Sequence, residues 1–348
     1  MTPPRSRGTG IANNKAEAED DRHDDHRPQW CIGRVDRRRT GDAGLRRMNR
    51  LRALFHAIVL AALAASPAYA RHARVAKPAA PVIAFTFDDV PAHGPLPPGV
   101  SRLDVVRAIT RALSEAKVPA FGFLNAGFGL DDPSAPLATA AWRKAGFPLG
   151  NHGYSHLNLD TVGADVFAAD VIRNEAPLAA AAGPGADWHW FRYPFLAEGR
   201  APTTREAIRA MLYARGYRAA AVTMGFGDYL WNPPYAVCVA KQDATGIARL
   251  EASFLSDARA AALAARARAK AQVGRDVPYV LLMHVGAFDA RMLPRLIALY
   301  REMGFRFVSL PEAERDPFFA AAADLSRPGP TPALPTPALP GPPAGLCA

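Results

Sequence analysis

Short apolar runs alternate with amphipathic stretches over residues 81–325, and this alternation predicts the fold. The runs have the length and composition of buried strands and cover residues 82–87, 118–124, 188–193, 217–223, 278–283 and 306–310. Between them, helical patterns cover residues 102–116, 137–145, 164–181, 203–215, 246–271 and 290–303. Strands that alternate with helices form a parallel sheet. At about 240 residues we expect an α/β fold, a single distorted (β/α) barrel, with a doubly wound open sheet as the alternative.

Residues 48–70 have the three-part pattern of a secretory signal peptide. Arg50 and Arg52 precede an apolar run over residues 54–65, and Ala68-Tyr-Ala70 provides a small-x-small cleavage site. A transmembrane anchor is the alternative, but the apolar run is short for a bilayer. We therefore expect an exported protein, periplasmic or extracellular, without a stable membrane span after cleavage.

The segments outside this signal and the central domain lack apolar periodicity. Residues 1–47 are rich in Arg, Asp, Gly and Asn, and we expect Met48 to be the true start, so that this extension is not native. Residues 71–80 then form a linker to the central domain. Residues 326–348 are Pro-rich and contain Thr-Pro-Ala-Leu-Pro twice. Such a tract favours polyproline II and predicts a disordered tail.

Charge and cysteine content narrow the functional classes. The net charge of +10 falls to +5 without residues 1–70, which carry 13 Lys and Arg and 8 Asp and Glu. That excess is small, and no helix-turn-helix or zinc-finger pattern is present, so no nucleic-acid partner is expected. An anionic wall substrate would suit it. Cys31, Cys238 and Cys347 do not form a disulfide framework. No obligatory protein partner is indicated.

Two adjacent carboxylates, Asp88 and Asp89, follow the first apolar run in the sequence Thr86-Phe-Asp-Asp. Burying two negative charges at the end of a strand is unfavourable unless a positive charge lies nearby. A bound metal ion would provide that positive charge for both carboxylates. A turn or helix N-cap is the alternative, because Pro91 follows closely.

His152 and His156 supply two further candidate ligands in the sequence His-Gly-Tyr-Ser-His. A lone H-x-x-x-H pattern also occurs in ordinary surface histidines, and Gly153 indicates a special backbone geometry rather than a helix. Two histidines and one carboxylate complete the usual catalytic zinc set. Either both aspartates bind the metal, or one binds it and the other takes a proton from water. The same ligands also suit cobalt, nickel or manganese.

Polar residues at other strand ends complete the candidate constellation. Arg192 and His284 each end a predicted strand, and carboxyl-terminal strand ends converge on one face of a (β/α) barrel. Arg192 is suited to hold a carboxylate, and His284 to act as a general acid. Asp228 could orient that imidazole, and Trp231 could stack on a sugar or belong to the core.

Four ordered motifs make residues 80–310 resemble the polysaccharide deacetylases, the NodB-type domains of carbohydrate esterase family 4. They are Thr86-Phe-Asp-Asp89, Asn151-His-Gly-Tyr-Ser-His156, Arg192-Tyr-Pro-Phe195 and Leu282-Met-His284. The resemblance implies a distorted (β/α) barrel, one divalent metal with zinc as the leading choice, and hydrolysis of N-acetyl groups on amino sugars of chitin-oligomer or peptidoglycan type.

The resemblance also implies a role for each motif residue. Asp89, His152 and His156 would bind the metal. Asp88 would be the catalytic base held by Arg192, and His284 the acid. The backbone N–H of Phe195 would help to stabilise the oxyanion, and Leu282 and Trp231 would line the acetyl pocket and its rim.

The chain departs from the family pattern at two places. Val90-Pro91 replaces the usual Gly-Pro, and Asp228-Tyr-Leu-Trp231 is a looser arrangement than the family motif. A short oligosaccharide or a non-polymeric acylated amine could suit the altered rims. The alternatives to an N-deacetylase are therefore a hydrolase of another non-peptide carbon–nitrogen bond and a non-catalytic wall-sugar-binding protein.

Overall fold

A computed structural model describes residues 80–334 and 337–347. The extension, the signal peptide and nearly all of the expected linker lie outside the described residues. Among the helices of the described part, none is long and apolar enough to cross a membrane.

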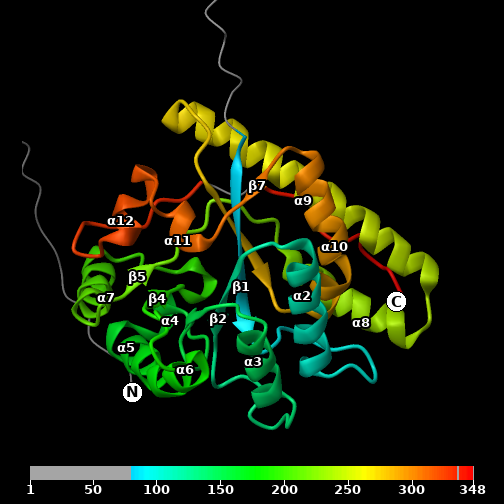
Figure 1. The fold of residues 1–348 in the computed structure, drawn as a ribbon, viewed down its shortest axis with the longest axis horizontal. Coiled ribbons are helices and arrows are strands. Elements are labelled where there is room, and N and C mark those ends of the chain that lie inside the picture. Colours follow the sequence, from blue (N-terminus) through cyan, green and yellow to red (C-terminus); the bar gives the residue numbers. More distant parts are fainter. Residues whose placement is uncertain (1–79, 335–336, 348) are drawn as a thin grey trace, which may run out of the picture. The chain divides into compact units, whose positions relative to one another are not determined.

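Seven parallel strands form one sheet in the order β5-β4-β3-β2-β1-β6, with β7 paired to the start of β1 (Figure 1). The strands are β1 Val82–Val90, β2 Ala120–Leu124, β3 Leu149–Asn151, β4 Trp190–Phe191, β5 Arg218–Ala219, β6 Tyr279–His284 and β7 Arg306–Phe307.

The segment after β5 joins the two ends of the sheet. Met224 forms a parallel bridge with Leu281 of β6. The N–H of Met224 donates to the Val280 carbonyl at 3.1 Å, and the Leu282 N–H donates to the Met224 carbonyl at 2.9 Å. The sheet is therefore a distorted (β/α) barrel, and this prediction is confirmed. Its closure depends on an irregular segment rather than on a full strand.

Helices lie around the sheet (Figure 1). They are α2 Arg102–Ala116, α3 Ala135–Lys144, α4 Leu159–Val162, α5 Ala164–Arg173, α6 Glu175–Ala182, α7 Pro202–Ala214, α8 Asn232–Ala240, α9 Ala244–Val273, α10 Ala287–Glu302, α11 Leu310–Ala313 and α12 Ala320–Ala323. Single turns of 3₁₀ helix cover η1 Pro194–Leu196, η2 Asp228–Trp231 and η3 Pro317–Phe319.

The single helix expected over residues 164–181 is two helices, α5 and α6, that meet at Asn174. Pro177 has no N–H to continue the ladder. The buried Asn174 side chain instead donates to the Leu124 carbonyl at 2.7 Å and accepts the Ala126 N–H at 3.0 Å. Asn174 thereby ties this helix junction to the end of β2, next to the loops that carry the candidate site.

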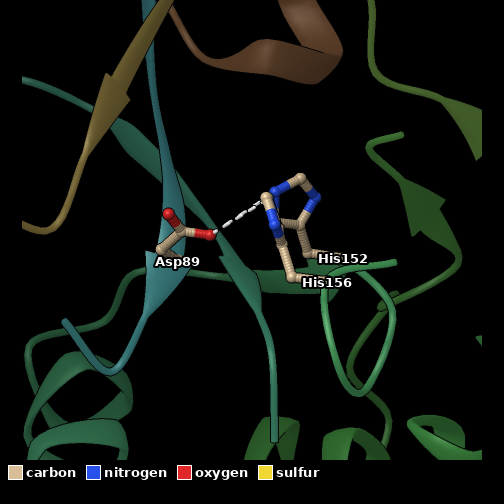
Figure 2. A group of neighbouring side chains, drawn as sticks. All are labelled: Asp89, His152 and His156. Carbon is tan, nitrogen blue, oxygen red and sulfur yellow. Dashed lines mark ion pairs between the residues drawn. The ribbon is translucent and has the colours of Figure 1, made fainter. Parts of the chain in front are cut away.

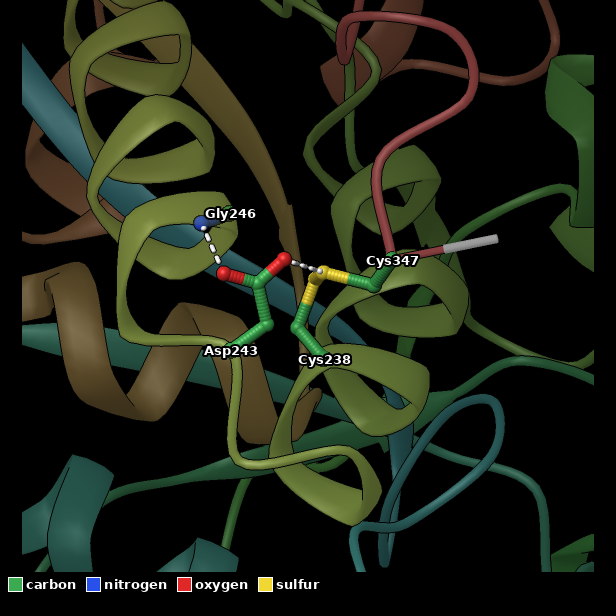
Figure 3. Close-up of a disulfide and its surroundings, with 4 residues drawn as sticks. All are labelled: Cys238, Asp243, Gly246 and Cys347. Atoms are coloured by element: carbon green, nitrogen blue, oxygen red, sulfur yellow. Dashed lines mark hydrogen bonds between the residues drawn. A yellow bond between two sulfur atoms is a disulfide. The ribbon is translucent and has the colours of Figure 1, made fainter.

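The C-terminal segment is anchored to the domain at several of its described residues, which differs from the expected disordered tail. Cys347 forms a disulfide with Cys238 of α8 (Figure 3). Leu334 is buried in the larger apolar core, and the Gly341 N–H donates to Asp257 at 2.8 Å. The leucines between the prolines and the disulfide give the segment contacts that composition alone does not reveal. The three cysteines were not expected to form a disulfide framework, and the structure corrects this for Cys238 and Cys347.

Candidate active site

Two neighbouring residues of β1 both reach the site, which regular strand geometry does not allow. Side chains alternate between the two faces of a strand, so Asp88 and Asp89 should point apart. The pairing of β1 with β2 shifts register between Phe87 and Val90, and Asp89 has a positive φ of 62°. Aspartate tolerates this left-handed conformation better than most residues. The irregularity brings both carboxylates to the wall of one cavity.

The Asp89 carboxylate points toward two imidazole rings (Figure 2). Its Oδ1 lies 3.7 Å from Nε2 of His152 and 3.6 Å from Nε2 of His156. One donor atom from each of the three residues lies within 4.8 Å of the others. Donors at this spacing can share one ion whose bonds are about 2 Å long.

The loop after β3 fixes the two histidines without a helix. Gly153 has φ +71°, and a Cβ there would lie 2.9 Å from a carboxylate oxygen of Asp170. The Asn125 side chain donates to the carbonyls of His152 and Gly153 at 2.6 and 2.8 Å. His156 also has a positive φ, of 54°. The special backbone geometry expected at Gly153 is present.

The tautomer of His152 follows from its partner. Its Nδ1 lies 2.8 Å from the carbonyl oxygen of Arg192, which can only accept, so Nδ1 carries the hydrogen. Nε2 is then the lone-pair nitrogen of the neutral ring, and it faces the carboxylates. Such a hydrogen bond to the far nitrogen is the usual support of a metal-binding histidine.

The electrostatics favour the protonation states that a metal requires. Burial opposes ionisation of Asp89, but the hydrogen bond with His93 and the surrounding imidazoles outweigh it and hold its pKa well below the usual range. Burial, and then the neighbouring His152, lower the pKa of His156 to about 4. At neutral pH the cluster therefore offers an anionic carboxylate and a neutral imidazole, the forms that bind a metal.

The cluster fits a divalent cation in one further respect. Oδ1 of Asp89 is buried and has no hydrogen-bond partner within the described part of the chain. A buried carboxylate oxygen without a donor is costly, and a cation would satisfy it. Two imidazole nitrogens and one carboxylate oxygen are a donor set that zinc accepts, and other first-row divalent metals also accept it.

Arg192 holds the other carboxylate. Its buried guanidinium donates from Nη1 to Oδ1 of Asp88 at 3.1 Å and from Nη2 to Oγ1 of Thr86 at 3.1 Å. Nε donates to the Ala220 carbonyl at 2.8 Å, and the group lies 4.7 Å from the centre of the Phe123 ring. Asp88 therefore has a guanidinium partner, whereas among the described residues Oδ1 of Asp89 faces the imidazoles of His152 and His156.

His284 at the end of β6 is held by Asp228. Oδ2 of Asp228 accepts the His284 backbone N–H at 2.6 Å, and Oδ1 lies 3.1 Å from its Nδ1. Burial would lower the pKa of His284, but the charge and hydrogen bond of Asp228 raise it to about 10, with help from Asp89 and Asp88. The imidazolium form therefore dominates at neutral pH, and its Nε2–H is available as a proton donor.

These groups line one cavity of about 320 Å³. Its walls include Asp88, Asp89, His93, His152, His156, Phe195, Leu196, Tyr229, Leu282 and His284. The structure thus brings together the expected ligands, base and acid with Phe195 and Leu282. Arg192 and Asp228 lie behind Asp88 and His284.

Trp231 does not lie at the rim, where it was expected. It is fully buried, its Nε1 donates to Oγ of Ser253 at 2.9 Å, and its ring packs near Phe226 and Phe254. An indole in this position cannot stack on a sugar. Tyr229, two residues earlier in the same 3₁₀ turn, is 41% exposed and lines the cavity instead.

Three lining residues were missed by reasoning from the sequence: His93, Leu196 and Tyr229. Each lies close to a recognised motif, but for Leu196 and Tyr229 no residue pattern specifies which neighbour faces the cavity. His93 could have been found from its position, because it lies only four residues after Asp89 in a loop rich in proline and glycine.

Comparisons with known proteins agree with the resemblance to the polysaccharide deacetylases. Residues 76–216 match the family model described as polysaccharide deacetylase. Among curated proteins, none matches the chain. This segment contains the three candidate metal ligands, Asp88 and Arg192, whereas Asp228 and His284 lie beyond it.

Several solved structures are similar to the chain. A family 4 carbohydrate esterase from Streptomyces lividans in complex with acetate is 19% identical, covers 68% of this chain and 97% of its own, and has a TM-score of 0.43. The chitin deacetylase from Colletotrichum lindemuthianum is 18% identical, with 68% and 89% covered and a TM-score of 0.45. A family 4 pseudoenzyme from Bacillus anthracis is 15% identical, with 68% and 66% covered and a TM-score of 0.47.

The motifs, the barrel and the family match agree with one another. The chain is similar to the polysaccharide deacetylases, hydrolases that act on carbon–nitrogen bonds other than peptide bonds, and its residues 76–216 match the model of that family.

Proposed function

We propose that this protein is an exported, metal-dependent deacetylase that removes N-acetyl groups from amino sugars of chitin-oligomer or peptidoglycan type. The observation that carries the proposal is the shared cavity of the cluster Asp89–His152–His156, Asp88 and His284. A protein that only bound wall sugars would not need an oriented base and an oriented acid. The complete set therefore favours catalysis over binding alone.

Asp89, His152 and His156 would hold the metal, with zinc as the leading choice. When bound, a divalent cation polarises the acetyl carbonyl and lowers the pKa of water toward about 7. Asp88 would take a proton from the attacking water, because the ion pair with Arg192 at 3.1 Å holds its carboxylate in a fixed orientation. The Arg192 guanidinium is fixed in turn by Thr86 and by carbonyls of the segment that closes the barrel.

His284 would donate the proton that the departing amine requires. Asp228 holds its ring through Nδ1, which leaves the opposite nitrogen for the leaving group. Leu282 and Phe195 would contact the acetyl methyl and the sugar, and the Phe195 N–H would help to stabilise the oxyanion. Tyr229, which lines the cavity, would contact a sugar ring in place of the buried Trp231.

Export is supported by the signal-peptide pattern over residues 48–70 and by the disulfide between Cys238 and Cys347. Disulfides persist in oxidising compartments such as the periplasm or the extracellular space. A wall polysaccharide is found in the same compartments.

The test is acetate release from acetylated chito-oligosaccharides and from peptidoglycan fragments, with a small acetanilide as a third substrate. The proposal predicts release from at least one sugar substrate, loss on chelation, and recovery when zinc is added back. His284→Ala is the matched inactive variant. Release from the acetanilide alone would favour the small-amide alternative, and release from none of the three would contradict an acetyl-amide hydrolase.

A further inference from the structure

His93 lies in the loop after β1, and this loop is anchored at two successive residues. The guanidinium of Arg102 on α2 donates to the Ala92 carbonyl. The backbone N–H of His93 donates to the Val285 carbonyl at 2.7 Å. Val285 directly follows His284, so His93 is tied to the strand that carries the candidate acid. These bonds place the imidazole at a defined position before any ligand binds.

The ring of His93 contacts one of the three candidate metal ligands directly. Its Nδ1 is paired with Oδ2 of Asp89, the oxygen that does not face the other two histidines. Oδ1 of the same carboxylate is the atom near Nε2 of His152 and His156. The two oxygens of Asp89 are thus divided between His93 on one side and the cluster on the other.

The identity of the donor follows from chemistry. An ionised carboxylate can only accept hydrogen bonds, so Nδ1 of His93 must carry the hydrogen in this pair. A nitrogen that donates to Oδ2 is not available as a metal ligand in the same arrangement. The side chain is still 30% exposed and its ring centre lies 5.1 Å from that of His284. It is therefore neither a core residue nor an isolated surface histidine.

We propose that His93 is a positioning residue for the metal centre: its Nδ1–H holds Oδ2 of Asp89, so that Oδ1 is presented together with the imidazoles of His152 and His156. This inference rests on the proposed function only in that the cluster binds a divalent metal. A carboxylate ligand on a short side chain can rotate about its last bond, and a fixed donor on the far oxygen removes that freedom. Loss of such support from a metal ligand typically weakens metal binding by about 10–100-fold.

The experiment measures zinc affinity rather than turnover. The metal-free full-length protein is titrated with zinc against a competing chelator, for the wild type and for His93→Ala, His93→Asn and His189→Ala. The amide nitrogen of asparagine can take the place of Nδ1 and donate to Oδ2, whereas alanine cannot. His189 lies beside Trp188 at the other end of β4 from Arg192, so its variant controls for the loss of a histidine as such.

We expect about 10–100-fold weaker zinc binding for His93→Ala, affinity close to the wild type for His93→Asn, and no change for His189→Ala. Circular dichroism of the metal-free forms verifies that each variant is folded. Unchanged affinity in His93→Ala, or equal losses in His93→Ala and His93→Asn, would overturn the assignment of a donating Nδ1. Absence of zinc binding in the wild type would overturn the metal-dependent function as well, which separates the two failures.

Discussion

Asp88 on β1 and His284 on β6 are register partners in adjacent parallel strands. The candidate base and the candidate acid are thus placed side by side by backbone pairing, and not by flexible loops. Each has its own support, Arg192 for the aspartate and Asp228 for the histidine. Because the supports are separate, the base and the acid can be tested independently.

Replacement of either aspartate should separate catalysis from metal binding. Asp88→Asn should keep the metal and lower kcat by about 10²–10⁴-fold, because only the base is removed. Asp89→Asn should lose the metal, because the oxygen that faces both imidazoles loses its charge. Metal content and turnover measured on the same preparations check this. Loss of metal in Asp88→Asn would show that both carboxylates are ligands.

The alkaline limb of the pH–rate profile should report His284. The acid form of this imidazole is present below its pKa of about 10 and is lost as the pH rises through that value. Asp228→Asn removes the main charge that raises the pKa, so the alkaline limb should move to lower pH by about 1–3 pH units. Profiles of kcat/KM between pH 6 and 11 measure the change.

Asp257→Asn is the matched control for Asp228→Asn. Asp257 is also buried, but it lies on α9 and accepts the Gly341 N–H at 2.8 Å, outside the cavity. The alkaline limb of the kcat/KM profile of Asp257→Asn should therefore lie at the same pH as that of the wild type. An unmoved limb in Asp228→Asn would contradict the assignment of His284 as the acid.

The disulfide should contribute measurably to stability. Cys238 and Cys347 are 109 residues apart in the sequence, and a cross-link of this length typically stabilises by about 2–4 kcal/mol. Cys347→Ser should lower the free energy of unfolding in urea by that amount, and reductant should lower it in the wild type but not in the variant. Equal stability of both proteins without reductant would indicate that the bond does not form.

Glu314 should make stability depend on pH in the opposite sense to most carboxylates. Burial raises its pKa to about 8, although the Ala221 N–H and the charge of Arg192 oppose this. The folded state therefore holds a proton that the unfolded state releases, and the wild type should lose stability as the pH rises from about 4.5 to 8.

Glu314→Gln removes that titration and keeps an acceptor for the Ala221 N–H, which lies 2.7 Å from Oε1 in the wild type. Its Tm should match the wild type near pH 4.5 and exceed it by several degrees at pH 8. Glu312→Gln, on the exposed side of α11, should show no such trend. A constant difference between Glu314→Gln and the wild type across this range would contradict the raised pKa.

The central architecture could be predicted because it depends on patterns that the sequence carries. Buried runs and helical periodicity identify most strands and helices, and in a barrel the strand ends converge. Leu149–Asn151, in contrast, is a strand of three residues, too short for a pattern to be recognised. The predicted strands over residues 188–193 and 217–223 shrink to two residues each, because the barrel is irregular there.

The fine structure of the site could not be predicted, because it depends on local backbone geometry. The register shift that turns Asp89 toward the cavity and the anchored loop that carries His93 have no periodic signal. The burial of Trp231 depends on which side of a single 3₁₀ turn faces the core. The packed tail depends on a covalent link between residues 109 positions apart.

The proposed activity depends most directly on one metal ion held by Asp89, His152 and His156. Elemental analysis of the purified protein, after loading with zinc and desalting, should give one metal per chain for the wild type and almost none for His156→Ala, with activity lost in parallel. A wild type that retains no divalent metal, or a His156→Ala variant that retains as much as the wild type, would contradict a metal centre at these three residues.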